Sequence, residues 1–170
     1  DGVHGRELWR SDGTPAGTVL LKDIKPGGES SSPQGFIVVN DVLFFIANDG
    51  VHGWELWRSD GTPTGTVLLK DIYPGVKNSL RCDEFGCETP SFTVVNDVLF
   101  FVANDGTHGQ ELWRSDGTPA GTVLVKDINP LSAGSNPADL FSYNNTLFFN
   151  TQYGTSTRFW QSDGTAEGTV

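Results

Sequence analysis

Three stretches of the chain each hold a histidine, a glutamate, an arginine, a serine and an aspartate within nine residues. The first reads DGVHGRELWRSDGTPAGTV at residues 1–19, and close copies occupy residues 49–67 and 105–123. A more divergent version, YGTSTRFWQSDGTAEGTV, occupies residues 153–170. Histidine, serine and aspartate are the side chains of a nucleophilic hydrolase, and clustered acids can bind a cation. The stretch therefore has two interpretations, a catalytic set or a structural motif.

The regular spacing of these residues argues against catalysis. A catalytic histidine acts with one distinct set of partners, whereas His4, His52 and His108 occupy the same place in three copies. The serine of each copy directly precedes the aspartate of an expected turn, where no histidine is adjacent. We therefore predict that these residues brace loops and that the chain is not an enzyme. A secreted hydrolase whose catalytic residues lie outside this sequence is the less favoured alternative.

A tryptophan marks the repeat, and its spacing gives a period of about 48 residues with one longer interval. Each unit holds four short runs rich in β-branched and aromatic residues, separated by turn formers. In the second unit the runs are FIVVN (36–40), VLFFIAN (42–48), ELWRS (55–59) and TVLLKDI (66–72). This pattern predicts four-stranded antiparallel sheets rather than helices.

Both faces of each expected sheet are apolar, so other sheets must cover them. Radial stacking of such sheets is the β-propeller arrangement, and a β-solenoid is the alternative. We predict an all-β chain with about three and a half blades, which is part of a larger ring or closes by self-association. The expected units are a partial blade over 1–24, blades over 25–72 and 73–128, and a blade over 129–170 that ends at the start of its last strand.

The most repeated residues are expected to be structural. The mid-strand tryptophans should fill the space between sheets, and the aspartates should close tight turns. These residues are Trp9, Trp57, Trp113, Trp160, Asp12, Asp60, Asp116 and Asp163. Asp60 is expected to accept bonds from backbone N–H groups, with Gly61 and Gly65 at positive φ. Glu7 and Arg10, with their copies, are expected to pair across the boundary between sheets.

The connections between expected strands differ in how much they vary. Asn40–Asp41 and Asn96–Asp97 suit a tight first turn, because both residue types tolerate left-handed backbone angles. The crossovers, which lead from the fourth strand of one unit to the next unit, vary most, over 25–35, 73–91 and 129–139. In a propeller, the crossovers and the middle loops, which join the second and third strands, share one end. We expect ligands to bind there, since loops on a rigid scaffold commonly carry binding sites.

The second crossover is the longest and carries six charged or aromatic residues that we predict to contact a ligand. They are Lys77, Arg81, Asp83, Glu84, Phe85 and Glu88. Cys82 and Cys87 lie in the same insertion among turn formers, and they suit a local disulfide bond in an oxidising compartment. Two free thiols are the alternative.

Acidic and amide residues around the middle loops suggest a calcium site, because Ca²⁺ prefers oxygen ligands on a flexible loop. The candidates are Asn48, Asp49 and Glu55 in one copy and Asn104, Asp105 and Glu111 in the next. The spacing is not that of an EF-hand loop, and Asp-Gly is also usual in tight turns. The fourth copy, NTQYGTSTR, has lost these acids, so no such site is expected there. No other cofactor is expected.

The stretch ELWRSDGTPAGTVLLKDI at residues 7–24 resembles the E-L-W-x-x-D-G-T repeat of large bacterial secreted and surface proteins. The matching residues, which recur through essentially the whole chain, are Glu7, Leu8, Trp9, Asp12, Gly13, Thr14, Gly17, Thr18 and their equivalents. The strand order is similar to that of kelch propellers, and the Ser-Asp-Gly-Thr hairpin is similar to the Asp-box of sialidase-type propellers. That box has a residue between Asp and Gly, so the resemblance implies no sialidase activity. It implies an exported protein.

The composition limits the partners. Twenty-one acidic residues against eleven basic ones give a formal net charge of −10, with no basic stripe for nucleic acid or for an anionic membrane surface. No apolar run approaches the ~18 residues of a membrane span, so no membrane insertion is expected. We expect an extracellular or cell-surface scaffold for adhesion or assembly, whose partner is an extracellular protein or polysaccharide. A carbohydrate-binding, lectin-like propeller is the alternative.

Overall fold

The computed structural model describes residues 1–83, 86–87, 91–130, 134–153 and 156–170. The regular structure in these residues is all β, and none of it is a helix long and apolar enough to cross a membrane. The strands form four successive sheets, which we number 1 to 4, and one small hairpin. The all-β prediction is therefore confirmed.

The bounds of the strands follow the repeat. Sheet 1 contains β1 (Leu8–Arg10) and β2 (Val19–Lys22). Sheet 2 contains β3 (Gln34–Val39), β4 (Val42–Asn48), β5 (Trp54–Ser59) and β6 (Val67–Lys70). Sheet 3 contains β9 (Thr93–Val95), β10 (Val98–Asn104), β11 (Gln110–Ser115) and β12 (Val123–Lys126). Sheet 4 contains β13 (Ala138–Tyr143), β14 (Thr146–Tyr153) and β15 (Ser156–Ser162), and the hairpin is β7 (Cys82–Asp83) with β8 (Gly86–Cys87).

Sheets 2 and 3 are the four-stranded antiparallel units that the sequence predicts, with neighbouring strands paired in chain order. Sheet 4 has three strands, and a reciprocal pair of backbone hydrogen bonds between Gln161 and Val170 begins a fourth. The first turns of sheets 2 and 3 are left-handed at Asn40, Asp41, Asn96 and Asp97, as predicted, with φ between 49° and 63°. These angles match the twist of a two-residue hairpin.

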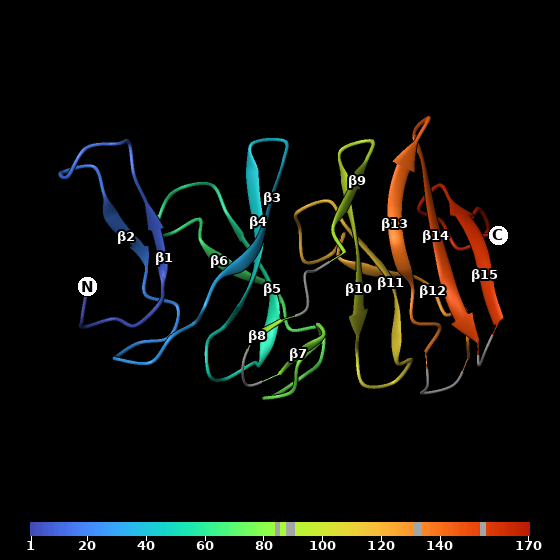
Figure 1. The fold of residues 1–170 in the computed structure, drawn as a ribbon, viewed down its shortest axis with the longest axis horizontal. Coiled ribbons are helices and arrows are strands. Elements are labelled where there is room, and N and C mark those ends of the chain that lie inside the picture. The colour runs from blue at the N-terminus through green and yellow to red at the C-terminus, as the bar shows by residue number, and fades with distance from the viewer. Residues whose placement is uncertain (84–85, 88–90, 131–133, 154–155) are drawn as a thin grey trace.

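The sheets stand side by side in chain order along the long axis of the molecule, and the two termini lie at opposite ends (Figure 1). The row is open and does not close into a ring. The first turns of sheets 2, 3 and 4 lie at one edge of the row, whereas the middle loops and the β7–β8 hairpin lie at the other edge (Figure 1). We call this second edge the loop end.

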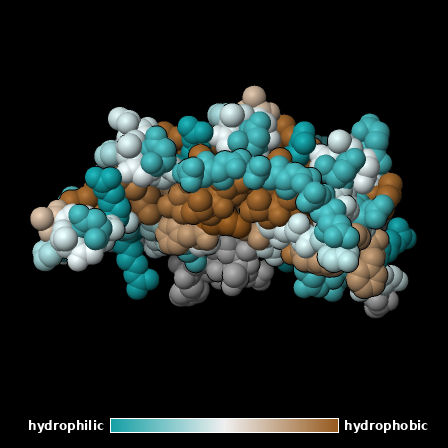
Figure 2. Space-filling model, turned by 90° about the horizontal axis from the view of Figure 1, so that it is seen from above, coloured by the Kyte–Doolittle hydropathy of each residue, from teal (hydrophilic) through white to brown (hydrophobic). Residues whose placement is uncertain are grey.

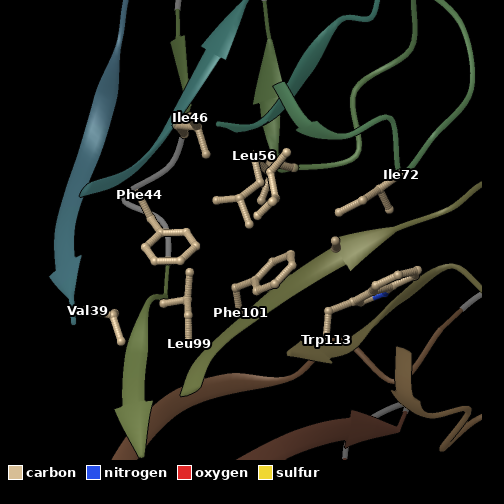
Figure 3. Close-up of a cluster of buried hydrophobic side chains, with 11 residues drawn as sticks. Val39, Phe44, Ile46, Leu56, Ile72, Leu99, Phe101 and Trp113 are labelled. Carbon is tan, nitrogen blue, oxygen red and sulfur yellow. The ribbon is translucent and has the colours of Figure 1, made fainter. Parts of the chain in front are cut away.

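Apolar side chains fill each boundary between neighbouring sheets, which we call junctions 1, 2 and 3. At junction 2, Phe44, Ile46 and Leu56 of sheet 2 form one buried cluster with Phe101 and Trp113 of sheet 3 (Figure 3). The neighbours of these residues along each strand point to the opposite face and belong to the clusters at junctions 1 and 3. Both faces of the inner sheets are therefore covered by other sheets, as the two-sided apolar pattern predicts.

The tryptophans of the repeat are buried only where a preceding sheet covers them. Trp57 and Trp113 are each 6% exposed, whereas Trp9 on sheet 1 is 40% exposed. At the other end of the row, Phe159 is 85% exposed, although Leu56 at the same place in sheet 2 is fully buried. Figure 2 shows that apolar side chains gather in a band along the middle of the molecule, between hydrophilic ones.

Candidate functional site

The Ser-Asp-Gly-Thr hairpins are built from the same hydrogen bonds in all four copies. In sheet 2, Asp60 Oδ1 accepts bonds from the backbone N–H of Thr62 at 2.9 Å and from its hydroxyl at 2.7 Å. The Ser59 and Thr66 hydroxyls bond each other at 2.7 Å across the base of the hairpin. The bonds from Thr62 lower the pKa of Asp60. The repeated serine and aspartate therefore hold a turn, as predicted, and the serine bonds a threonine rather than a histidine.

One detail of this hairpin differs from the prediction. Gly61 has the expected positive φ of 85°, but Gly65 does not have a positive φ. A Cβ atom at Gly65 would lie 2.0 Å from Asp60 Oδ1, and the equivalent glycines of the other copies meet the same carboxylate at 1.9–2.2 Å. Gly65 is therefore required because the Asp60 side chain packs onto its backbone.

The glutamate of the repeat is buried and fastens each junction. Glu55 is fully buried on β5, and its carboxyl oxygens accept bonds from the backbone N–H groups of Ile72 and Tyr73 at 3.2 Å. Its Oε2 also accepts a bond of 2.6 Å from the hydroxyl of Ser79 in the crossover to sheet 3. Ser79 O in turn accepts a bond of 2.8 Å from the N–H of Asn104 at the end of β10. The glutamate thus links the third strand of one sheet to the second strand of the next.

The equivalent bonds recur at the other junctions. Glu7 accepts bonds from Ser31 N at 2.8 Å and Ser31 Oγ at 2.5 Å, and Glu111 accepts bonds from Ser135 N at 2.7 Å and Ser135 Oγ at 2.6 Å. Burial raises the pKa of Glu55 to about 8, and it raises the pKa of Glu111 against the opposing effect of its hydrogen bonds. These carboxyl groups accept hydrogen bonds from protein groups, so they stabilise the contacts between sheets.

The predicted pairing of the repeated glutamate with the repeated arginine is wrong. Arg58 donates a bond of 2.8 Å from Nη1 to the carbonyl of Gly117, which lies in the hairpin of the next sheet. Arg10 makes the equivalent bond to Gly61 at 3.2 Å. Glu55 and Arg58 alternate along the strand, so the arginine reaches the next sheet, whereas the glutamate bonds the crossover that follows its own sheet.

The repeated histidines brace the middle loops. His52 Nδ1 lies 2.6 Å from Asp49 Oδ2, while Asp49 Oδ1 accepts bonds from the backbone N–H groups of Val51 and His52. The hydrogen bond to Asp49 raises the pKa of His52. Burial raises the pKa of Asp49, but the bonds from His52 and Val51 outweigh it, so this pKa is lower than usual. The same arrangement joins His4 to Asp1 and His108 to Asp105.

The predicted calcium ligands make separate local bonds. Asn48 Oδ1 and Asn104 Oδ1 each accept the N–H of a following glycine at 2.7 Å, and Asp49 and Asp105 hold the middle loops. Glu55 and Glu111 are turned into the junctions. Within the described part of the chain, no group of three or more His, Cys, Asp or Glu residues could hold a metal ion. The geometry gives the calcium prediction no support.

The second crossover packs along the loop end. Lys77 Nζ lies 5.3 Å from the centroid of the Tyr73 ring, and Arg81 Nη2 donates a bond of 2.7 Å to Asn136 Oδ1 in the third crossover. A Cβ at Gly53 would meet Lys77 O at 2.3 Å, so a middle loop and this crossover are in contact, as predicted. Of the other predicted ligand-binding residues, Glu84, Phe85 and Glu88 lie outside the described residues, and for Asp83 only the backbone is described.

The β7–β8 register places Cys82 directly opposite Cys87. Residues opposite each other in an antiparallel pair have Cα atoms about 4.5–5.5 Å apart, which is within the range that a disulfide bridge spans. The disulfide bond between these residues stays a prediction, which the backbone register favours.

The structure also has a hollow that the sequence did not single out. It lies at junction 3, has a volume of about 310 Å³, and is lined by Ile128, Asn129, Ser135, Thr151, Gln152, Arg158 and Trp160. At junctions 1 and 2 the crossover serine is bonded to the second strand of the next sheet, through Asn48 N at 3.1 Å and Asn104 N at 2.8 Å. Among the described residues, no such bond joins Gln152 to Ser135. The hollow therefore occupies the place where this link is missing.

No protein-family model and no curated protein matches the chain. Among solved structures, the chain is similar to an α-L-arabinofuranosidase from Clostridium thermocellum, with 15% sequence identity and a TM-score of 0.38. The match covers 84% of this chain and 50% of that protein, so the chain spans about half the length of the structure it matches. A likeness of this size carries no conclusion about activity.

Proposed function

We propose that the chain is a non-enzymatic repeat scaffold of the extracellular space or cell surface, which binds an extracellular protein or polysaccharide through its loop end. The observation that carries this proposal is that the repeated polar side chains bond to the protein itself. Glu55, Asp60 and His52, with their copies, form hydrogen bonds with neighbouring backbone and side chains. A scaffold needs such bonds in every unit, whereas catalysis needs one exposed set.

The loops of this scaffold provide the surface on which the copies differ. The second and third crossovers contact each other through Arg81 and Asn136, and they lie beside the middle loops. Such a set of adjoining loops on stacked sheets is a usual place for recognition. A propeller ring completed by further repeats or by a second copy would present these loops together at one end. The alternative function is carbohydrate binding, which the mixed polar and aromatic hollow at junction 3 favours.

The test is binding of the whole chain to immobilised extracellular polysaccharides and proteins. In one variant, the second crossover (73–91) is replaced by the shorter first crossover sequence (25–35). Loss of binding in this variant supports the proposal. The matched control is Asp97→Gly in the first turn of sheet 3, at the opposite edge of the row, where Asn-Gly suits the left-handed turn. Binding that is lost in the control and kept in the crossover variant contradicts the proposal.

A further inference from the structure

One edge of β1 has no strand beside it. Among the described residues, β1 pairs with β2 alone, whereas the equivalent strands β5 and β11 each pair with a strand on both sides. Sheet 1 therefore consists of the third and fourth strands of the repeat. The free edge of β1 presents backbone N–H and C=O groups with which a further strand can pair.

Apolar side chains of sheet 2 are exposed on the face that is turned toward sheet 1. Phe36, whose ring lies 5.9 Å from that of Phe45 in the junction 1 cluster, is 55% exposed, and Val38 is 62% exposed. The equivalent residues of sheet 3, Phe92 and Val94, are partly buried against the junction 2 cluster, to which the first two strands of sheet 2 contribute. Phe36 and Val38 are exposed because sheet 1 has no such strands to cover them.

The other sheets show which structure fits beside β1. The sequence ELWRS at residues 7–11 recurs unchanged in β5 and β11, and these strands pair with β4 and β10, whose sequences are VLFFIAN and VLFFVAN. At junction 2, Phe44 and Ile46 of β4 point toward sheet 3 and help to form the cluster on which its first strand packs. A hairpin like β3–β4 would therefore match the backbone edge of β1 and the apolar face at Phe36 and Val38 at the same time.

We propose that the free edge of β1 is a docking site for a β-hairpin of this same repeat, which another polypeptide carries. The second strand of the hairpin pairs antiparallel with β1, in the register in which β4 pairs with β5, and its side chains cover Phe36 and Val38. Backbone hydrogen bonds supply the affinity of such an added strand, and its alternating side chains supply the specificity. This inference rests on the proposed function, because it names the structure by which a protein partner assembles with the scaffold.

The test is titration of the whole chain into a labelled synthetic peptide with the sequence of residues 34–48, followed by fluorescence anisotropy. The same peptide with Ile46→Pro, which cannot continue the second strand, should not bind. On the chain, Val38→Lys places a charge where the hairpin packs, and it should weaken binding about tenfold. The matched control is Val51→Lys in a middle loop, which should bind like wild type. The two valines are 62% and 61% exposed, so neither variant removes a buried side chain.

Hydrogen exchange of the backbone amides of β1, measured by NMR, reports on the edge directly. The bound hairpin should slow the exchange of those amides of Leu8–Arg10 that β2 does not bond. No binding of the peptide, unchanged exchange in β1, or equal weakening by Val38→Lys and Val51→Lys overturns this inference. The loop end lies away from these residues, so binding through the second crossover that Val38→Lys leaves intact would keep the proposed function without it.

Discussion

Glu55 and Ser79, which are 24 residues apart, join two sheets through a hydrogen bond of 2.6 Å between the Ser79 hydroxyl and Glu55 Oε2. The same separation recurs for Glu7 with Ser31 and for Glu111 with Ser135. A buried carboxyl group is costly unless it is bonded, so these contacts specify how neighbouring sheets meet. The glutamate that first suggests a catalytic role therefore connects neighbouring sheets.

This burial gives Glu55 a predictable effect on stability. Its pKa rises from the ordinary 4.5 to about 8 in the folded chain, so folding favours the protonated form. The stabilising contribution is complete below pH 4.5 and is lost as the pH rises through about 8. We expect the free energy of unfolding of wild type, measured with urea, to fall between pH 5 and 8.5 by a few kcal/mol more than that of Glu55→Gln.

The matched control for this comparison is Glu167→Gln, at an exposed position. It should keep the wild-type pH dependence. Equal pH dependence of wild type and Glu55→Gln would show that the carboxyl group of Glu55 does not carry the effect.

The Ser-Asp-Gly-Thr hairpin predicts a ranking of two glycine substitutions. Gly65→Ala would place a Cβ 2.0 Å from Asp60 Oδ1, so the carboxylate that holds the turn must move. Gly61→Ala meets no atom within 4 Å and carries only the strain of a positive φ, about 1–2 kcal/mol. We expect Gly65→Ala to lower the free energy of unfolding by more than Gly61→Ala, as measured by chemical denaturation. The reverse order would mean that the close packing of Asp60 is not needed.

The tryptophans of the repeat should differ in their contribution to stability. Trp57 is 6% exposed between sheets 1 and 2, and its replacement by alanine should cost about 3–5 kcal/mol. Trp9 has the same place in the repeat but is 40% exposed, so Trp9→Ala should cost less than about 2 kcal/mol. Urea denaturation of the two variants measures the difference. Equal losses would contradict the stacking of the sheets in chain order.

The repeat unit could be predicted from the sequence because its signals are local. Alternating apolar positions, Asn-Asp turns and Asp-Gly hairpins fix each strand and turn within a few residues. The packing of Asp60 onto Gly65 could not be predicted in the same way, since a glycine in a turn usually indicates a positive φ. The sequence contains one sign of the pairing between Glu55 and Ser79, which is the constant separation of 24 residues in each copy. No local pattern connects the two residues, so the pairing could not be predicted.

The candidate site was predicted less completely than the fold. The crossovers were chosen because they vary, and the structure places the second crossover at the loop end beside a middle loop. The hollow at junction 3 was missed because its lining comes from a crossover and from two strands of the next sheet. The sequence does contain a signal for it. The fourth copy has Arg158 at the position where the second copy has Glu55, so an acidic residue is lost there and a cation is gained.

The His–Asp pairs of the middle loops predict a measurable titration. The hydrogen bond to Asp49 raises the pKa of His52 above 6.5, so the bond stabilises the loop at low pH and this contribution is lost as the pH rises through the raised value. Asp49→Asn should lower the pKa of His52, because it removes the largest effect that raises it, and NMR of the ring protons follows the change. His108 is the internal control and should keep its raised pKa in the same variant. A His52 pKa that Asp49→Asn does not change would exclude Asp49 as its cause.

The two ends of the row predict self-association. Each junction joins the tryptophan face of one sheet to the opposite face of the preceding sheet, and both kinds of face are open at the ends of the row, at Trp9 and Phe159. A second copy can cover them head to tail, since the contact repeats one already made within the chain.

Sedimentation should show a mass that grows with concentration, and Phe159→Gln should weaken the association about tenfold, because it removes a large apolar contact. Val76→Gln, which removes a 76% exposed side chain from the second crossover, should leave the mass unchanged. A chain that stays monomeric at high concentration, or one that Val76→Gln dissociates as readily as Phe159→Gln, would contradict closure through the end faces.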